Sequence, residues 1–174
     1  MRYALLAIAA IAAPMAGVAV AAQDAKLLNV PSANWNVYGS GQTHKAHRDK
    51  NVQGGGAVRV AIPIKPANVW DIGASTAITK PIRKGDKLIF AFWVKLVSGG
   101  ADGKSAVAAH IQRSSAPYDA IVTGQVELTG EWKLVHVRGI ANADYPPGAA
   151  NAALSLGGAA HTFDLGPAFI MLAD

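Results

Sequence analysis

The chain has 174 residues, 16 of them basic and 11 acidic, with no cysteine and a formal net charge of +5. The lack of cysteine excludes a disulfide-stapled scaffold, a thiol nucleophile and a cysteine-ligated zinc site. The basic excess is small and scattered. Its densest stretch, residues 45–50, lacks the interleaved aromatic residues of a nucleic-acid platform. We therefore expect a domain that is held together by its apolar core and does not bind nucleic acid.

Residues 1–22 have the features of a secretory signal peptide. Arg2 supplies a positive start, residues 4–13 form an apolar run, and small residues precede a cleavage point after Ala22. The alternative is a membrane anchor, but the stretch is only weakly apolar and no stop-transfer charges follow it. We predict a secreted or periplasmic protein with one domain, residues 23–174, and no membrane span after the leader is removed.

Apolar residues alternate with polar ones along most of the remaining chain, a pattern typical of half-buried β-strands. The segments with this pattern are residues 57–64, 87–97, 105–113, 131–140, 152–156 and 162–172. Glycine-rich and proline-rich turns separate them. The alanines of 105–113 also suit a helix, but the glycines before this segment favour a strand. The strand pattern predicts an all-β fold of roughly nine strands, a sandwich or a barrel, and we expect an antiparallel β-sandwich.

No catalytic motif stands out. The serines, histidines and acidic residues form no nucleophile elbow, no zinc-protease helix motif and no recognisable carboxylate pair. Residues 98–105 resemble a phosphate loop, but Ser98 occupies the position of its first glycine. His44 and His47 are close in sequence, yet a metal site would need a further ligand. We predict no catalytic residue and no metal ligand.

Two strands direct side chains that suit sugars to faces that should be solvated. In 87–97 and in 105–113, uniformly apolar residues occupy one face of each strand. The residues on the opposite faces include Trp93 and Lys95 in the first strand, and His110 and Gln112 in the second. If the strands are neighbours, one outer face carries all four side chains. The alternative is that Trp93 fills a minor core beneath a covering loop.

The other aromatic residues lie at segment ends. Trp70 follows Ala67-Asn68-Val69, and Tyr118 sits at a loop-to-strand junction, a usual position for a ring that lines a cleft. Trp132 begins a strand, and we expect it in the core. The position of Trp35 stays open between the core and the rim of a site.

The order of segments resembles the jelly-roll carbohydrate-binding modules of bacterial xylanases and the non-catalytic domains beside sialate O-acetylesterases, which share a galactose-binding-like fold. The residues that carry this resemblance are Gly55–Val60, Val69–Asp71, Ile82–Leu88, Phe92–Lys95, Gln112–Tyr118, Val126–Trp132, Ala143–Tyr145, Leu156–Gly157 and Phe163–Gly166. The resemblance implies a concave sheet face that binds glycans through aromatic and amide side chains. It assigns this role to Trp70, Trp93, Gln112 and Tyr118.

Many members of the family also hold a structural calcium ion through oxygen ligands near the chain ends. Asp164 lies in the matching terminal strand, but no cluster of acidic residues surrounds it in the sequence. We therefore predict no cofactor, with calcium as the one ion that the resemblance raises.

The function we predict is non-catalytic binding of a polysaccharide or oligosaccharide. The predicted binding residues are Trp70, Trp93, Lys95, His110, Gln112 and Tyr118. Two alternatives stay open. Related sandwiches also serve as structural or protein-interaction domains of the cell envelope, and an unrecognised glycan-active enzyme is the third choice.

Overall fold

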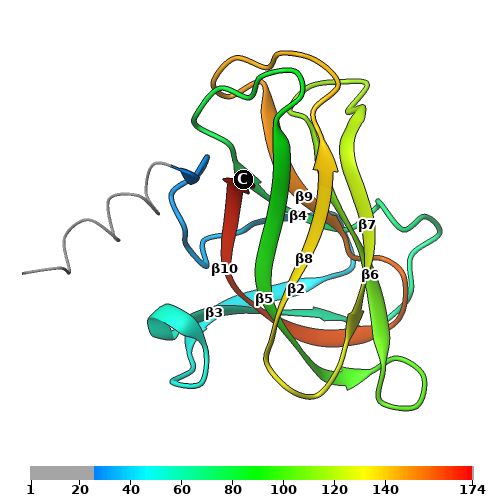
Figure 1. Ribbon diagram of the computed structural model, residues 1–174. Helices are drawn as coiled ribbons and strands as arrows, with labels where there is room; N and C mark the ends of the chain where they lie inside the picture. Colours follow the sequence, from blue (N-terminus) through cyan, green and yellow to red (C-terminus); the bar gives the residue numbers. More distant parts are fainter. Residues whose placement is uncertain (1–25, 174) are drawn as a thin grey trace, which may run out of the picture.

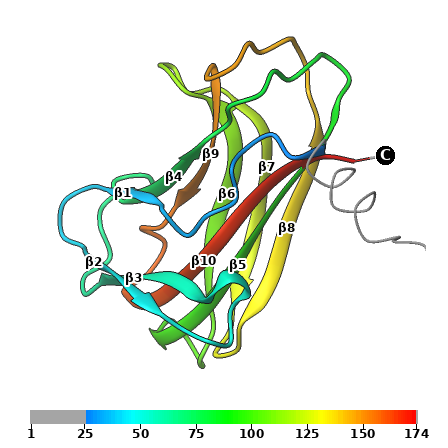
Figure 2. The same ribbon diagram turned by 90° about the vertical axis from the view of Figure 1, so that its left-hand side faces the viewer.

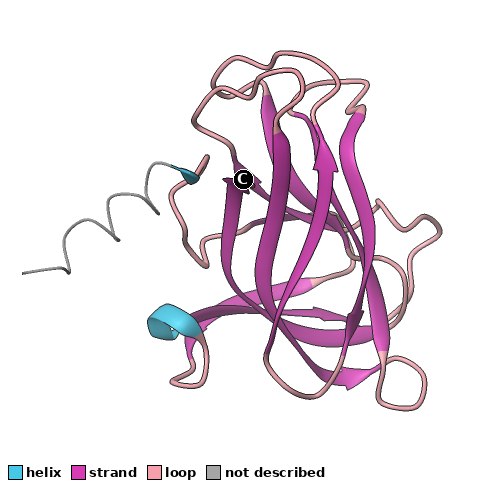
Figure 3. Cartoon of the chain, viewed as in Figure 1, coloured by secondary structure: helices cyan, strands magenta, loops and turns pink. Residues whose placement is uncertain are grey.

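A computed structural model describes residues 26–173; the predicted signal peptide lies outside the described residues. The chain folds into two five-stranded sheets packed face to face, in which all neighbouring strands are antiparallel (Figures 1 and 3). The first sheet has the order β1-β4-β9-β6-β7 and the second has the order β2-β3-β10-β5-β8. The predicted antiparallel sandwich is confirmed.

The ten strands cover most of the described chain, and the one short 3-10 turn, η1, spans Gln53–Gly55. The strands are β1 (Asn36–Tyr38), β2 (Thr43–Arg48), β3 (Gly56–Ile62), β4 (Gly73–Ala77), β5 (Lys87–Gly99), β6 (Ser105–Arg113), β7 (Ala120–Leu128), β8 (Lys133–Ile140), β9 (Ala150–Ser155) and β10 (His161–Leu172). The alanine-rich segment 105–113 is therefore a strand, as its flanking glycines indicate.

The core lies between the sheets and is built from the inward residues of each alternating strand. In β5 and β6 these are the residues that the sequence pattern selects, and all are buried. Phe90 and Phe92 pack with ring centroids 5.0 Å apart, and Trp35 contacts both rings. The indole N–H of Trp35 donates to the Gly166 carbonyl at 2.8 Å, so this residue belongs to the core. Replacing such an aromatic core residue by alanine costs about 3–5 kcal/mol.

The β5–β6 connection carries the chain from the second sheet to the first, as Figure 2 shows. Gly99 and Gly100 both adopt positive φ angles there, and a Cβ on Gly99 would lie 2.5 Å from the Ala160 carbonyl oxygen. These two glycines permit the sharp crossing because they have no side chain. Sequential strands usually pair, but these two do not. Their outer faces therefore point to opposite sides of the molecule.

His161 joins the two sheets at one end of the core. It lies at the start of β10, is 3% exposed, and has its Nδ1 atom 2.6 Å from Ser105 Oγ on β6. Its Nε2 atom lies 2.9 Å from the Leu156 carbonyl oxygen, which can only accept. Nε2 therefore carries the proton, and Nδ1 accepts from the serine hydroxyl. Burial lowers the pKa of His161, an effect that the Leu156 carbonyl partly offsets.

We predict that the folded state loses stability in mild acid. The unfolded chain binds protons at the ordinary histidine pKa, whereas His161 in the folded protein binds them only at lower pH. The stabilisation that neutral His161 contributes is therefore fully present above the pKa of the unfolded chain. It is lost as pH falls toward the lower pKa of the folded protein. Urea unfolding at several pH values between about 7 and 5 should show a declining free energy of unfolding.

The variant His161→Gln should reduce the pH dependence of the free energy of unfolding, because an amide does not titrate. Burial also lowers the pKa of His110, so His110→Gln should remove a further part. An unchanged pH slope in both variants would contradict the assignment.

Candidate functional site

The outer face of the first sheet carries two adjoining hollows, here called together the sheet groove. Its aromatic end, about 720 Å³, is lined by residues that include Tyr38, Trp70, Gln112, Tyr118 and Asn151. Its wide end, about 1010 Å³, is lined by residues that include Lys65, Lys104, Ala108, Gln125 and Glu127. Ser155 on β9 lines both ends, so the two hollows adjoin at this residue.

Trp70 is presented by the loop between β3 and β4. Asp71 closes a turn in this loop, since its carboxylate accepts from the backbone N–H of Asn68 at 2.9 Å. Gly157 fixes the turn to the sheet, because its N–H donates to the Val69 carbonyl at 2.9 Å. A Cβ on Gly157 would lie only 2.9 Å from the Asn68 carbonyl oxygen, so a side chain there would displace the loop. The indole itself is 66% exposed and lines the groove.

Two tyrosines complete the aromatic end. Tyr118 follows Pro117 in the β6–β7 loop, is 55% exposed, and has a φ of 59°. Such a conformation costs a non-glycine residue about 1–3 kcal/mol and is found most often at functional sites. Tyr38 lies on β1 opposite Gly73, whose missing side chain leaves the space that its ring occupies. Burial, and then the nearby Tyr118, raise the pKa of Tyr38, so its hydroxyl stays protonated and can donate.

The floor of the groove offers hydrogen-bonding groups. Gln112 on β6 lies opposite Asn151 on β9, so both amides share the outer face. The Oδ1 atom of Asn151 is buried and has no hydrogen-bond partner. His110 lies two residues from Gln112 on the same face of β6. Its Nδ1 atom is 3.0 Å from Thr123 Oγ1, and its Nε2 atom is 3.5 Å from Ser155 Oγ. A buried acceptor without a partner is costly, and a ligand hydroxyl would satisfy it.

The structure gathers part of the predicted site and separates the rest. Trp70, Gln112 and Tyr118 line the aromatic end, and His110 lies in the adjoining floor. Trp93 and Lys95 lie on β5, in the other sheet. The prediction that they share a face with His110 and Gln112 is therefore wrong, because the chain changes sheets between β5 and β6. The outward orientation of each residue within its own strand is confirmed.

Trp93 packs beneath a covering loop. It is half-buried, its indole N–H lies 3.2 Å from Gln53 Oε1 in η1, and its Cβ lies against Gly166 on β10. This agrees with the alternative in which Trp93 fills a minor core. Trp132 also lies here and outside the main core, contrary to expectation. Its indole N–H donates to Asp49 at 2.9 Å.

Sequence reasoning missed Tyr38, Asn151 and Ser155. Asn151 and Ser155 could have been found from the strand pattern, because Ala152 and Leu154 between them are buried and set the outward positions of β9. No local signal points to Tyr38, because its place depends on the pairing of β1 with β4.

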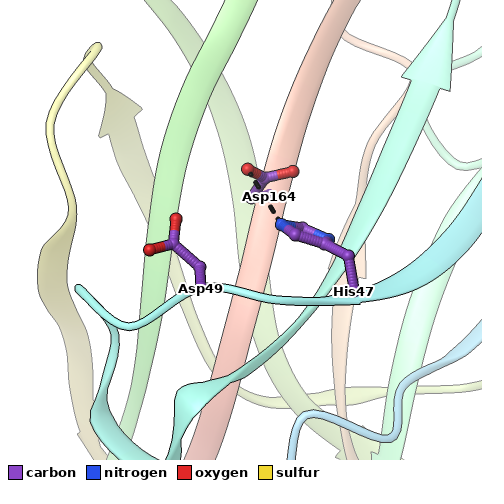
Figure 4. A group of neighbouring side chains, drawn as sticks. All are labelled: His47, Asp49 and Asp164. Carbon is purple, nitrogen blue, oxygen red and sulfur yellow. Dashed lines mark ion pairs between the residues drawn. The ribbon is translucent and has the colours of Figure 1, made fainter.

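A group of charges covers the outer face of the second sheet. His47, Asp49 and Asp164 have ligand-type atoms within 4.8 Å of one another and converge on this face (Figure 4). The Asp164 carboxylate is fully buried and is held by Arg59 through two hydrogen bonds of 2.8 and 2.9 Å. The Lys95 ammonium lies 3.2 Å from Asp49 and 3.6 Å from Asp164, and 5.1 Å from the centre of the Trp132 ring.

This group does not fit a calcium site. Calcium takes six to eight oxygen ligands, whereas here two carboxylates face two cationic side chains and an imidazole. Lys95 lies between the carboxylates, where a metal ion would have to lie. Hydrogen bonds from Trp132, then from the Asn51 backbone, together with Lys95, lower the pKa of Asp49, so its carboxylate stays ionised. We propose that Lys95 and Arg59 neutralise these acids without a metal ion.

We predict that 5 mM calcium and 5 mM EDTA give the same thermal unfolding midpoint. Lys95→Met should lower stability by about 1–3 kcal/mol, because it leaves charged acceptors without their partner. Lys133→Met, on β8 of the same sheet, is the matched control and should have little effect. A lower midpoint of the unmodified protein in EDTA would contradict the proposal.

Comparisons with known proteins agree with this architecture. No curated protein matches the chain. Among solved structures, a CBM4 module is 16% identical, with a TM-score of 0.59 over 80% of this chain and 86% of that one. The CBM22-1 xylan-binding domain from Paenibacillus barcinonensis Xyn10C is 17% identical, with a TM-score of 0.55 over 84% and 91%.

The second N-terminal cellulose-binding domain from Cellulomonas fimi β-1,4-glucanase C is 20% identical, with a TM-score of 0.60 over 86% of this chain and 95% of that one. These likenesses are likenesses of fold. The profile of the carbohydrate binding domain family CBM_4_9 matches residues 31–138, which include β1 to β8 up to Arg138. The chain therefore belongs to this family of carbohydrate binding domains, and its function is non-catalytic sugar binding.

Proposed function

We propose that the sheet groove binds the internal stretch of a β-1,4-linked polysaccharide of the xylan or cellulose type. The observation that carries this is the pair of exposed rings, Trp70 and Tyr118, over a floor that holds the unpaired Oδ1 atom of Asn151. Sugar rings present flat C–H faces that stack on aromatic rings. Their hydroxyls can donate to Asn151 and bond with Gln112.

The shape of the groove supports binding along a chain. The aromatic end adjoins the wide end at Ser155, and we infer that the two together have room for several consecutive sugar residues. Solved structures of the same fold include a xylan-binding domain and a cellulose-binding domain. A ligand of this kind would lie across β9 and β6, whose outer faces form the floor.

The composition of the aromatic end supports binding without catalysis. Its lining consists of aromatic, amide, hydroxyl, proline and alanine side chains, and no carboxylate of the described residues belongs to it. Glycoside hydrolysis requires two carboxyl groups at the scissile bond. We therefore infer that the chain itself does not cleave its ligand.

We also infer that the protein acts outside the cytoplasm. The leader pattern of residues 1–22 supports export. Among residues 26–173, no helix is long and apolar enough to cross a membrane.

We predict that Trp70→Ala weakens binding of xylohexaose or cellohexaose at least about 10-fold, the scale found for aromatic anchors at binding interfaces. Its stability should change by less than about 0.5 kcal/mol, because the indole is exposed. Calorimetric titration and urea unfolding would measure the two effects separately.

Trp93→Ala is the matched control, since it removes the same ring from the opposite sheet. It should cost about 1–3 kcal/mol of stability, as for a partly buried side chain, and leave affinity unchanged. Unaltered binding by Trp70→Ala, or loss of binding by Trp93→Ala in folded protein, would place the site elsewhere.

A further inference from the structure

The two ends of the sheet groove differ in chemistry. The aromatic end carries three rings and no ionised side chain among the described residues. The wide end has no aromatic residue in its described lining, and its walls carry two lysines, Lys65 and Lys104. A linear polysaccharide of identical sugar residues would not require the two ends of the groove to differ in charge and aromatic content.

The wide end has spare room as well as charge. Its floor and rim are formed by small residues, including Ala106, Ala108, Gly158, Ala159 and Ala160. Gly158 lies so close to β6 that a Cβ there would be 3.2 Å from the Ala106 carbonyl oxygen. The resulting hollow, about 1010 Å³, is larger than the aromatic end at about 720 Å³. This space suits a sugar that carries a branch.

The charge of the wide end is positive after its internal ion pair is counted. Glu127 is the one acid in the described lining, and it lies 3.5 Å from the Lys104 ammonium. Lys65, in the β3–β4 loop, is exposed and makes no ion pair with a carboxylate of the described residues. Gln125 on β7 adds an amide that can donate to an acceptor. One cation and one amide are therefore available to an anionic group.

We propose that the wide end recognises an acidic branch, a hexuronic acid, on the polysaccharide held at the aromatic end. Lys65 attracts the branch carboxylate, Gln125 donates to it, and the small floor residues admit the extra ring. This inference rests on the proposed function and deepens it by naming the ligand as an acidic, branched glycan.

The experiment compares two ligands of equal backbone length, linear xylohexaose and xylohexaose with one glucuronic acid branch. At 20 mM NaCl the protein should bind the branched ligand about 3-fold more tightly, the size that a partly exposed ion pair supports. The preference should fade at 0.5 M NaCl, where the screening length is about 4 Å.

Lys65→Ala should abolish the preference and leave affinity for linear xylohexaose within 2-fold of the unmodified protein, whereas Lys65→Arg should keep it. Lys133→Ala removes an equal charge from the other sheet and should keep it too. Equal binding of both ligands by the unmodified protein, or a preference that survives Lys65→Ala, would overturn the inference alone. Binding of neither ligand would overturn the proposed function with it.

Discussion

The burial of one face of the central strands determines where most polar side chains of this domain can lie. Phe90, Phe92 and Phe163 are fully buried between the sheets, and the strands that carry them alternate inward and outward residues. A register slip of one residue would expose this whole apolar set, so the register is strongly specified. The residues that alternate with these buried positions along a strand therefore lie on its outer face. The groove and the charge group follow from this alternation.

The two outer faces use their polar groups differently. On the second sheet, Asp164 is held by Arg59 and Lys95, and Asp49 is held by Lys95 and Trp132, so the acidic groups there are all paired, although the buried Nδ1 atom of His47 has no hydrogen-bond partner. On the first sheet, the Oδ1 atom of Asn151 is left without a partner, and large rings lie in solvent. Proteins leave such groups unsatisfied mainly at functional sites. The exposed rings beside this unpaired acceptor support our proposal that the first sheet is the binding face.

The strand pattern predicted an all-β sandwich or barrel and much of the facing of its side chains, but not the pairing of strands. Period-two alternation correctly placed Gln112 and Trp93 outward within their own strands. It could not show that the chain crosses to the other sheet at Gly99 and Gly100, between the strands of these two residues, because strand pairing is a long-range property. Tyr38 shows the same limit, since its ring reaches the groove only through the contact of β1 with Gly73. Loop residues such as Trp70 could be proposed from family resemblance, but their convergence depends on contacts far apart in sequence.

Backbone hydrogen bonds fix the two loops that carry the exposed rings of the aromatic end. Gly157 ties the Trp70 loop to the sheet, and the Tyr118 backbone N–H donates to the Ser115 carbonyl at 2.9 Å, so the backbone that carries both rings is fixed before a ligand arrives. Preorganised rings lose little entropy on binding, and they can supply most of the affinity. Lys65 is a flexible, solvated cation, which gains less from any single contact. The electrostatic attraction of Lys65 nevertheless acts over several ångströms and favours an acidic ligand over a neutral one. We therefore propose that the aromatic end supplies most of the affinity and the wide end the discrimination.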